Sequence, residues 1–252
     1  RFRPIPDKRG VMRLAAATWP EVSEYLKTKN SLIVPIGSTE QHGPTGLIGT
    51  DYLSADAVAR EAGERLKILV SPPLSYGVSS HHMGFPGSAT IRPSVYQAVL
   101  ADLFRGFYGH GFRRFYVVNG HGGNEASVRA AFQELKHEGH SGATFQLLDW
   151  WKLPEVSKLA NELYGNEEGS HATPTELSLT FHLENIERRE YQPVPEPPSS
   201  AWPLTSDEMR RSFVTGTMRS NPALARGSHG PRILEAAVQG LVTVIGNSPV
   251  LE

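Results

Sequence analysis

The chain has 252 residues, of which 39% are hydrophobic, which is sufficient for one large domain spanning residues 1–252. Its 25 basic and 26 acidic residues nearly balance, which argues against nucleic acid or an acidic membrane surface as a partner. The absence of cysteine excludes disulfides, thiolate catalysis and cysteine-ligated zinc. No apolar run is long enough to span a membrane and no signal peptide is recognisable, so a cytoplasmic protein is expected.

Short apolar runs alternate with helical patterns along the chain. Strands are predicted at residues 32–36, 68–70, 114–118, 145–148 and 241–245. Helices are predicted at residues 51–66, 94–108, 124–137, 154–164, 174–183 and 231–240. This alternation is typical of an α/β protein with a mainly parallel sheet and helices on both faces.

Three polar clusters follow predicted strands or begin predicted helices. Glu40 and His42 come just after the first strand, and residues 119–124 (NGHGGN) join a later strand to a helix. His171 and Glu176 lie at the start of another helix. Because open parallel sheets bind ligands outside the carboxyl ends of their strands, these clusters are expected to meet at one site.

The residue types in these clusters indicate a metal site. Glu40 and His42 are two apart in an extended segment and can point to the same side. The glycines of 119–124 leave His121 as the reactive side chain there, and Asp51 begins its own helix. Two imidazoles with three carboxylates, including Glu176, suit Zn²⁺, Mn²⁺ or a related ion, and five ligands fit a two-metal site with one bridging carboxylate.

Each cluster also has a simple structural interpretation. Asp51 can cap a helix, and Glu176 can be an acidic residue favoured by the dipole of a helix N-terminus. Residues 119–124 can be a tight turn or a cradle for an anion. Glu40 and His42 can bond to loop amides. The joint occurrence of all three clusters favours the metal hypothesis over these separate explanations.

The motifs resemble the signature of the creatininase (creatinine amidohydrolase) family. They keep the family order over roughly residues 30–180, and the combination is far more specific than any single motif. The resembling segments are residues 37–44 (GSTEQHGP), 49–51 (GTD), 76–87 (YG through His82 to FPG), 119–124 (NGHGGN) and 171–176, which begins with His-Ala where the family has HAG.

The resemblance implies a three-layer α/β/α sandwich with a dinuclear metal centre. It implies that Glu40, His42, Asp51 and His121 are ligands, with Asp51 bridging two divalent ions per chain, Zn²⁺ or Mn²⁺, with Fe²⁺ as a further candidate. It also implies hydrolysis of a non-peptide C–N bond in a small-molecule amide, often a cyclic one such as creatinine. Family members commonly form homo-hexamers.

Two departures from the family weaken the case for creatinine as substrate. Creatinine-hydrolysing members carry a bulky residue and a metal-binding glutamate where this chain has Gly122 and Gly123, so Glu176 is predicted as the fifth ligand. The HAG segment reads HAT at 171–173, and Pro174 replaces the acidic residue that follows. Relatives of this architecture deformylate ring-opened pyrimidines or trim peptides during cofactor maturation, and both activities remain alternatives.

The mechanistic hypothesis is attack by a metal-activated water, with a general acid that protonates the leaving nitrogen. His171 is the predicted acid, because the matching family histidine shuttles protons, and Glu176 is counted with it among the catalytic residues. His82, Gly122 and Gly123 are predicted to bind substrate. An equal alternative for His82 is a loop histidine that bonds to the backbone.

Two hypotheses from other functional classes remain. A phosphate- or nucleotide-binding module would use the glycine-rich turn of 119–124 as a cradle, but it needs a basic residue beside the turn. Arg113 and Arg114 lie at the opposite end of the strand. A catalytically inactive scaffold is the other hypothesis, and the altered HAG segment keeps it open.

Overall fold

A computed structural model describes residues 12–196 and 202–248 of the chain. At its centre is a four-stranded sheet in the order β2-β1-β3-β4, in which every neighbouring pair of strands is parallel. The strands are β1 (Ser31–Ile36), β2 (Leu69–Val70), β3 (Arg114–Asn119) and β4 (Thr144–Asp149). The prediction of a mainly parallel sheet is confirmed.

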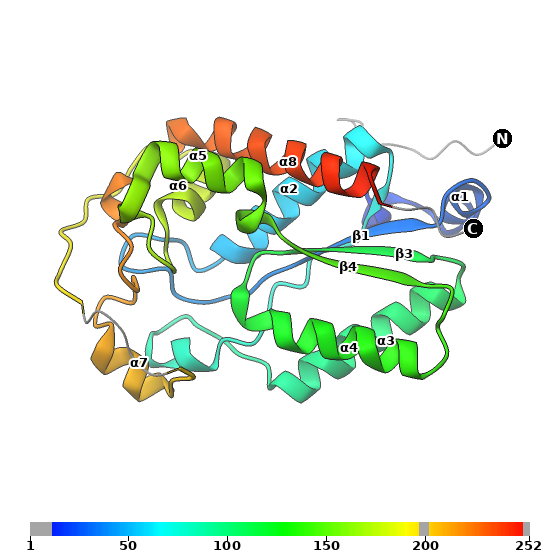
Figure 1. Cartoon of the computed structure of the whole chain (residues 1–252), viewed down its shortest axis with the longest axis horizontal. Coiled ribbons are helices and arrows are strands. Elements are labelled where there is room, and N and C mark those ends of the chain that lie inside the picture. The colour runs from blue at the N-terminus through cyan, green and yellow to red at the C-terminus, as the bar shows by residue number, and fades with distance from the viewer. Residues whose placement is uncertain (1–11, 197–201, 249–252) are drawn as a thin grey trace.

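Helices cover both faces of this sheet, which gives the predicted three-layer α/β/α sandwich. Helices α2, α5, α6 and α8 form the layer above the sheet in Figure 1, and α3 and α4 form the layer below it. The longer helices are α2 (Thr50–Leu66), α3 (Pro93–Gly109), α4 (Glu125–His137), α5 (Pro154–Tyr164), α6 (Pro174–Leu183) and α8 (Gly230–Gly246). No helix in the described ranges is both long and apolar enough to cross a membrane.

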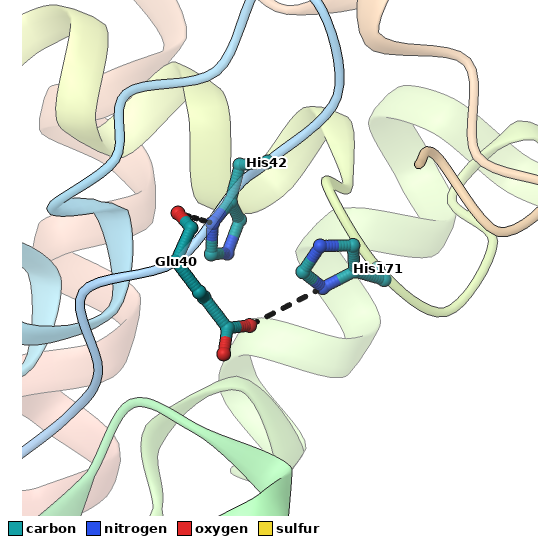
Figure 2. A group of neighbouring side chains, drawn as sticks. All are labelled: Glu40, His42 and His171. Atoms are coloured by element: carbon teal, nitrogen blue, oxygen red, sulfur yellow. Dashed lines mark hydrogen bonds and ion pairs between the residues drawn. The ribbon is translucent and has the colours of Figure 1, made fainter. Parts of the chain in front are cut away.

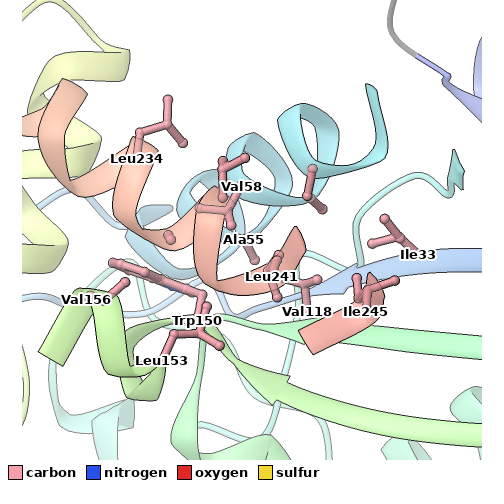
Figure 3. Packing of buried hydrophobic residues seen from close by; sticks show 14 of the residues in the cluster. Ile33, Ala55, Val58, Val118, Trp150, Leu153, Val156, Leu234, Leu241 and Ile245 are labelled. Carbon is pink, nitrogen blue, oxygen red and sulfur yellow. The ribbon is translucent and has the colours of Figure 1, made fainter. Parts of the chain in front are cut away.

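The alternation of side chains along each strand divides the core in two. Ile33 and Val118 pack into the cluster with α2, α5 and α8, part of which is drawn in Figure 3. Leu32, Val34 and Phe115 pack into the cluster with α3 and α4. All six residues of β1 are buried, as expected for a parallel strand covered on both faces.

One predicted element is wrong, and two observed helices were not predicted. The expected strand at 241–245 is the last part of α8. Its run of β-branched residues suggested a strand. The buried side chains instead recur every four residues and continue the helical face of the preceding segment: Ile233, Ala237, Leu241 and Ile245. The unpredicted helices are α1 (Trp19–Leu26) and α7 (Ser206–Ser212), and a capping box begins each of them.

The parallel register brings the polar segments of the sequence to one edge of the sheet. Ile36, at the end of β1, pairs with Asn119, and Asn119 pairs with Asp149 at the end of β4. The loop after β1 therefore begins beside the 119–124 turn. This is the carboxyl edge of a parallel sheet, where such folds bind ligands.

Candidate metal centre

A close approach between the end of β3 and the start of α2 brings His121 to Asp51. A Cβ atom added to Gly120 would lie 2.1 Å from the backbone oxygen of Asp51, so only glycine fits there. Asp51 lies in the first turn of α2, and its side chain is 2% exposed. His121 is 6% exposed and follows Gly120 directly. The glycine is therefore required for the imidazole and the carboxylate to meet.

Five buried or half-buried side chains of the predicted site, together with His171, lie in one cluster. Their potential ligand atoms form three overlapping groups, within each of which all atoms lie within 4.8 Å of one another. The groups are Glu40–His42–His171, Glu40–Asp51–His121 and His42–Asp51–Glu176. Figure 2 shows how the side chains of the first group face one another. The structure therefore brings together every residue that the sequence predicted as a ligand.

Hydrogen bonds to backbone carbonyls determine which nitrogen of His121 is free. Its Nε2 lies 2.9 Å from the carbonyl oxygen of Val78, and a carbonyl can only accept, so Nε2 carries the hydrogen. In the neutral ring, Nδ1 then carries no hydrogen and presents a lone pair. This Nδ1 lies 3.3 Å from Glu40 Oε1 and 3.3 Å from Asp51 Oδ2.

The same arrangement recurs at two further histidines. His42 Nδ1 lies 3.3 Å from the backbone oxygen of Glu40, which leaves Nε2 free at 2.9 Å from Asp51 Oδ1. His171 Nε2 lies 2.8 Å from the backbone oxygen of Gln41, which leaves Nδ1 free at 3.8 Å from Glu40 Oε1. Backbone acceptors of this kind commonly orient metal-ligating histidines.

Lone pairs that face carboxylates require a cation between them. Both oxygens of Glu40, His42 Nε2 and Asp51 Oδ2 are buried and have no hydrogen-bond partner. In the metal-free chain a proton fills this need. Burial opposes the charge on His42, but Asp51 outweighs burial and raises the pKa of His42 to about 9. Burial likewise opposes the charge on His121, yet Glu40 and Asp51 raise its pKa well above the usual range. A divalent ion with nitrogen and oxygen ligands, such as Zn²⁺ or Mn²⁺, fits the same donor set.

Glu176 has both of the roles considered for it. It forms a capping box with Thr173, in which Thr173 N donates to Glu176 Oε2 at 2.9 Å and Glu176 N donates to Thr173 Oγ1 at 3.1 Å. Only one carboxylate oxygen takes part in this box, and the side chain also belongs to a candidate ligand group. Burial and the nearby charge of Asp51 outweigh the opposing effect of His42 and raise the pKa of Glu176 to about 7.

The structure separates the three residues predicted to bind substrate. Gly122 lines the cleft beside the cluster. A Cβ added to Gly123 would lie 2.4 Å from His121 Nε2, so Gly123 packs behind that ring. His82 is 1% exposed and lies behind Glu40, with its Nε2 at 3.2 Å from Glu40 Oε1. Neither Gly123 nor His82 is among the residues that line this cleft.

The cleft has a volume of about 540 Å³ and opens between α5, the loop before α6 and the 119–124 turn. Its wall includes His121, His171 and Glu176 on the side of the cluster. Trp151 and Lys152 line another part. Lys152 Nζ lies 2.6 Å from Glu125 Oε1 and 3.0 Å from Asp149 Oδ2, so the cationic group on this wall is already paired.

Sequence reasoning missed the buried amides that support the cluster. The side chain of Asn119 accepts from the backbone N–H of His121 at 3.1 Å and donates to Asp149 at 2.8 Å. Asn124 donates to the backbone of Gly37 at 3.0 Å and accepts from Val78 at 3.0 Å. The two asparagines at the ends of NGHGGN were the available signal, because buried amides need partners on both sides.

The chain is similar in sequence to known proteins. The family model described as creatinine amidohydrolase (Creatininase) matches residues 15–245. The creatinine amidohydrolase of Pseudomonas putida is 27% identical over 247 residues, covering 90% of this chain and 94% of that protein. A mycofactocin precursor peptide peptidase of Mycolicibacterium smegmatis is 39% identical over 158 residues, covering 60% of this chain and 57% of that protein.

Solved structures give the same result. A crystal structure of creatinine amidohydrolase (creatininase) matches with a TM-score of 0.80 and 26% identity, covering 95% of this chain and 99% of that one. A manganese form of creatininase matches with a TM-score of 0.78, and a Zn-Zn type mutant with 0.77. With the ordered motifs, the fold and the family match in agreement, this chain belongs to the creatininase (creatinine amidohydrolase) family of hydrolases.

Proposed function

We propose that the chain is a metal-dependent amidohydrolase that cleaves a non-peptide C–N bond of a small-molecule amide, with a cyclic amide as the leading substrate class. The observation that carries the proposal is the pair of imidazole lone pairs, on His42 and His121, that face buried carboxylates at 2.9 Å and 3.3 Å. Such pairs need a cation, and the relatives named above include hydrolases.

Two ions fit this site better than one. The groups Glu40–Asp51–His121 and His42–Asp51–Glu176 share only Asp51. Asp51 presents a different oxygen to each histidine, with Oδ1 toward His42 and Oδ2 toward His121. A carboxylate with this orientation suits a bridging ligand. The related creatininases named for Mn and Zn-Zn support Mn²⁺ or Zn²⁺, with Fe²⁺ as a further candidate.

When bound, the ions would polarise the amide carbonyl and lower the pKa of water to about 7. His171 Nδ1 carries no hydrogen and lies on the cluster side of the ring, so it can accept the proton of the attacking water. Burial, with the nearby charge of His42, lowers the pKa of His171 to about 3, so the ring is neutral at neutral pH and gives up readily any proton that it takes. The same proton then passes to the leaving nitrogen as the C–N bond breaks.

A second candidate substrate is a peptide that the enzyme trims. The cleft of about 540 Å³ can hold a ligand of drug size, and a single small ring would leave much of it filled with water. The similarity to a peptide peptidase over 158 residues also favours this candidate. Assays therefore need both cyclic amides and short peptides.

The first test is metal content by elemental analysis of protein reloaded with Zn²⁺ or Mn²⁺, followed by an amide hydrolysis screen. We expect close to two equivalents per chain and turnover that EDTA abolishes. Well-folded protein that binds no metal after reloading would contradict the proposal and favour the inactive scaffold.

We also propose that residues 1–252 form one domain and that the chain assembles into a homo-oligomer, a hexamer by family resemblance. Light scattering coupled to size-exclusion chromatography tests the assembly. A monomer at micromolar concentration would contradict it. The cytoplasmic location remains a prediction from the sequence.

A further inference from the structure

Gln41 is a buried amide, 4% exposed, and the polar atoms of its side chain all have partners. Oε1 lies 2.8 Å from the backbone nitrogen of Gly43. Nε2 lies 3.1 Å from the carbonyl oxygen of Gly216 and 2.9 Å from His82 Nδ1. It also lies 3.1 Å from His171 Nε2, but that nitrogen carries its own hydrogen toward the backbone oxygen of Gln41, so the two amide hydrogens go to Gly216 and His82. A fully satisfied buried network of this kind has one preferred arrangement.

The partners fix which end of the amide faces His82. The backbone nitrogen of Gly43 can only donate, so an oxygen must face it. The carbonyl of Gly216 can only accept, so a nitrogen must face it. The nitrogen of Gln41 therefore faces His82 Nδ1, which must accept, and the hydrogen of the neutral ring must be on Nε2.

This tautomer of His82 has a consequence for Glu40. His82 Nε2 lies 3.2 Å from Glu40 Oε1, so the N–H group lies beside the carboxylate without the alignment of a hydrogen bond. The opposite tautomer would place a lone pair beside a carboxylate that is 0% exposed, which is unfavourable in a buried site. The amide of Gln41 thus acts on Glu40 through His82.

Toward His171, Gln41 presents an acceptor instead of a donor, namely its backbone carbonyl oxygen. The carbonyl oxygen of Gln41 lies 2.8 Å from His171 Nε2, which places the hydrogen on Nε2 and leaves Nδ1 bare. The rings of His82 and His171 are stacked, with centroids 4.4 Å apart and planes at 28°. One residue therefore contacts both rings of the stack and gives them different roles.

We propose that Gln41 is a positioning residue, which holds His82 in the tautomer that places its Nε2–H beside Glu40 and His171 in the tautomer that presents a bare Nδ1. Its effect on catalysis rests on the proposed function, whereas its effect on the tautomers does not. A mutation of Gln41 can remove the side-chain hydrogen bond to His82 alone, because the hydrogen bond to His171 is made by the backbone.

The test combines histidine ¹⁵N NMR with metal binding in wild type and two variants, with a third variant for signal assignment. Spectra of wild type, Gln41→Met and Ser88→Ala are recorded metal-free and zinc-loaded, and His82→Asn identifies the His82 signals. Methionine matches the length of glutamine but cannot hydrogen-bond to the ring. Ser88 Oγ accepts from the backbone nitrogen of Gln41 at 3.0 Å, so Ser88→Ala removes a bond to the same residue without touching the amide.

We expect His82 to be a single Nε2–H tautomer in wild type and Ser88→Ala, and a mixture in Gln41→Met. Metal affinity should fall about 10- to 100-fold in Gln41→Met, as for other residues that orient ligands. An Nδ1–H tautomer in wild type, or a Gln41→Met protein with unchanged tautomer and affinity, would overturn the proposal. The expected tautomers in a protein that neither binds metal nor hydrolyses amides would support the Gln41 assignment and contradict the proposed function.

Discussion

His42 Nε2 lies 2.9 Å from Asp51 Oδ1, and the two side chains are 0% and 2% exposed. The other ring nitrogen of His42 is directed at the backbone oxygen of its own neighbour, Glu40, at 3.3 Å. An imidazole oriented in this way presents a lone pair to a buried carboxylate, and only a proton or a metal ion makes that contact favourable. A proton and a metal ion therefore compete for the same position at His42.

Metal affinity should increase with pH up to about pH 9. The pKa of His42 is raised to about 9, so its proton is present below that pH and must leave when the metal binds. Each proton displaced makes binding about tenfold tighter per pH unit in this window. Isothermal titration calorimetry in buffers of different ionisation enthalpy measures the protons released. Affinity that does not change with pH would show that the metal does not displace this proton.

Replacing His121 with alanine should remove metal binding without unfolding the protein. His121 Nδ1 faces both Glu40 and Asp51, so its loss should lower metal affinity by more than the roughly 100-fold typical of residues that only orient ligands. Metal content and kcat/KM are measured beside circular dichroism. His137→Ala is the control, because His137 is exposed at the end of α4. Wild-type metal content in His121→Ala would contradict the assignment.

Thr173→Ala should affect both stability and the metal centre. It removes the acceptor for Glu176 N at 3.1 Å, which should cost about 0.5–2 kcal/mol and free the Glu176 carboxylate from its capping box. Thr205→Ala is the matched control, since Thr205 and Glu208 form the same box at the start of α7. Urea unfolding should give losses in both variants, whereas elemental analysis should reveal lost metal only in Thr173→Ala. Equal metal content in the two variants would show that Glu176 is not a metal ligand.

Two neighbouring glycines should respond differently to alanine. A Cβ at Gly120 would lie 2.1 Å from the backbone of Asp51, so Gly120→Ala should destabilise by about 1–3 kcal/mol and weaken metal binding. A Cβ at Gly122 meets nothing within 4 Å, so Gly122→Ala should change stability by no more than about 0.5 kcal/mol. Gly122 lines the cleft, so its variant should alter KM. Equal stability of the two variants would contradict the close approach of β3 to α2.

Leu241→Ala tests the last helix. Leu241 is fully buried among the residues of the core beside α2, so its truncation should cost about 2–5 kcal/mol. Gln239→Ala, on the exposed side of α8, should change stability by less than about 0.5 kcal/mol. Chemical denaturation measures both values. A small loss for Leu241→Ala would show that α8 does not pack there.

The sequence by itself determined the alternation of strands and helices, because hydrophobic period is a local property of the chain. It also determined the residues that converge. Glu40 and His42 follow one strand and His121 follows another, and parallel strands place such positions at one edge. Helices α1 and α7 were missed, and 241–245 was mistaken for a strand, because β-branched residues suggested a strand where burial against α2 stabilised a helix.

Only the tertiary structure decided how the histidines are oriented. Gln41 and His82 are 41 positions apart, and Gln41 and His171 are 130 apart, so no local spacing predicts their contacts. The role of His82 depends on the atom that faces its Nδ1. That atom is determined by long-range hydrogen bonds, which form only when the loops fold over the sheet.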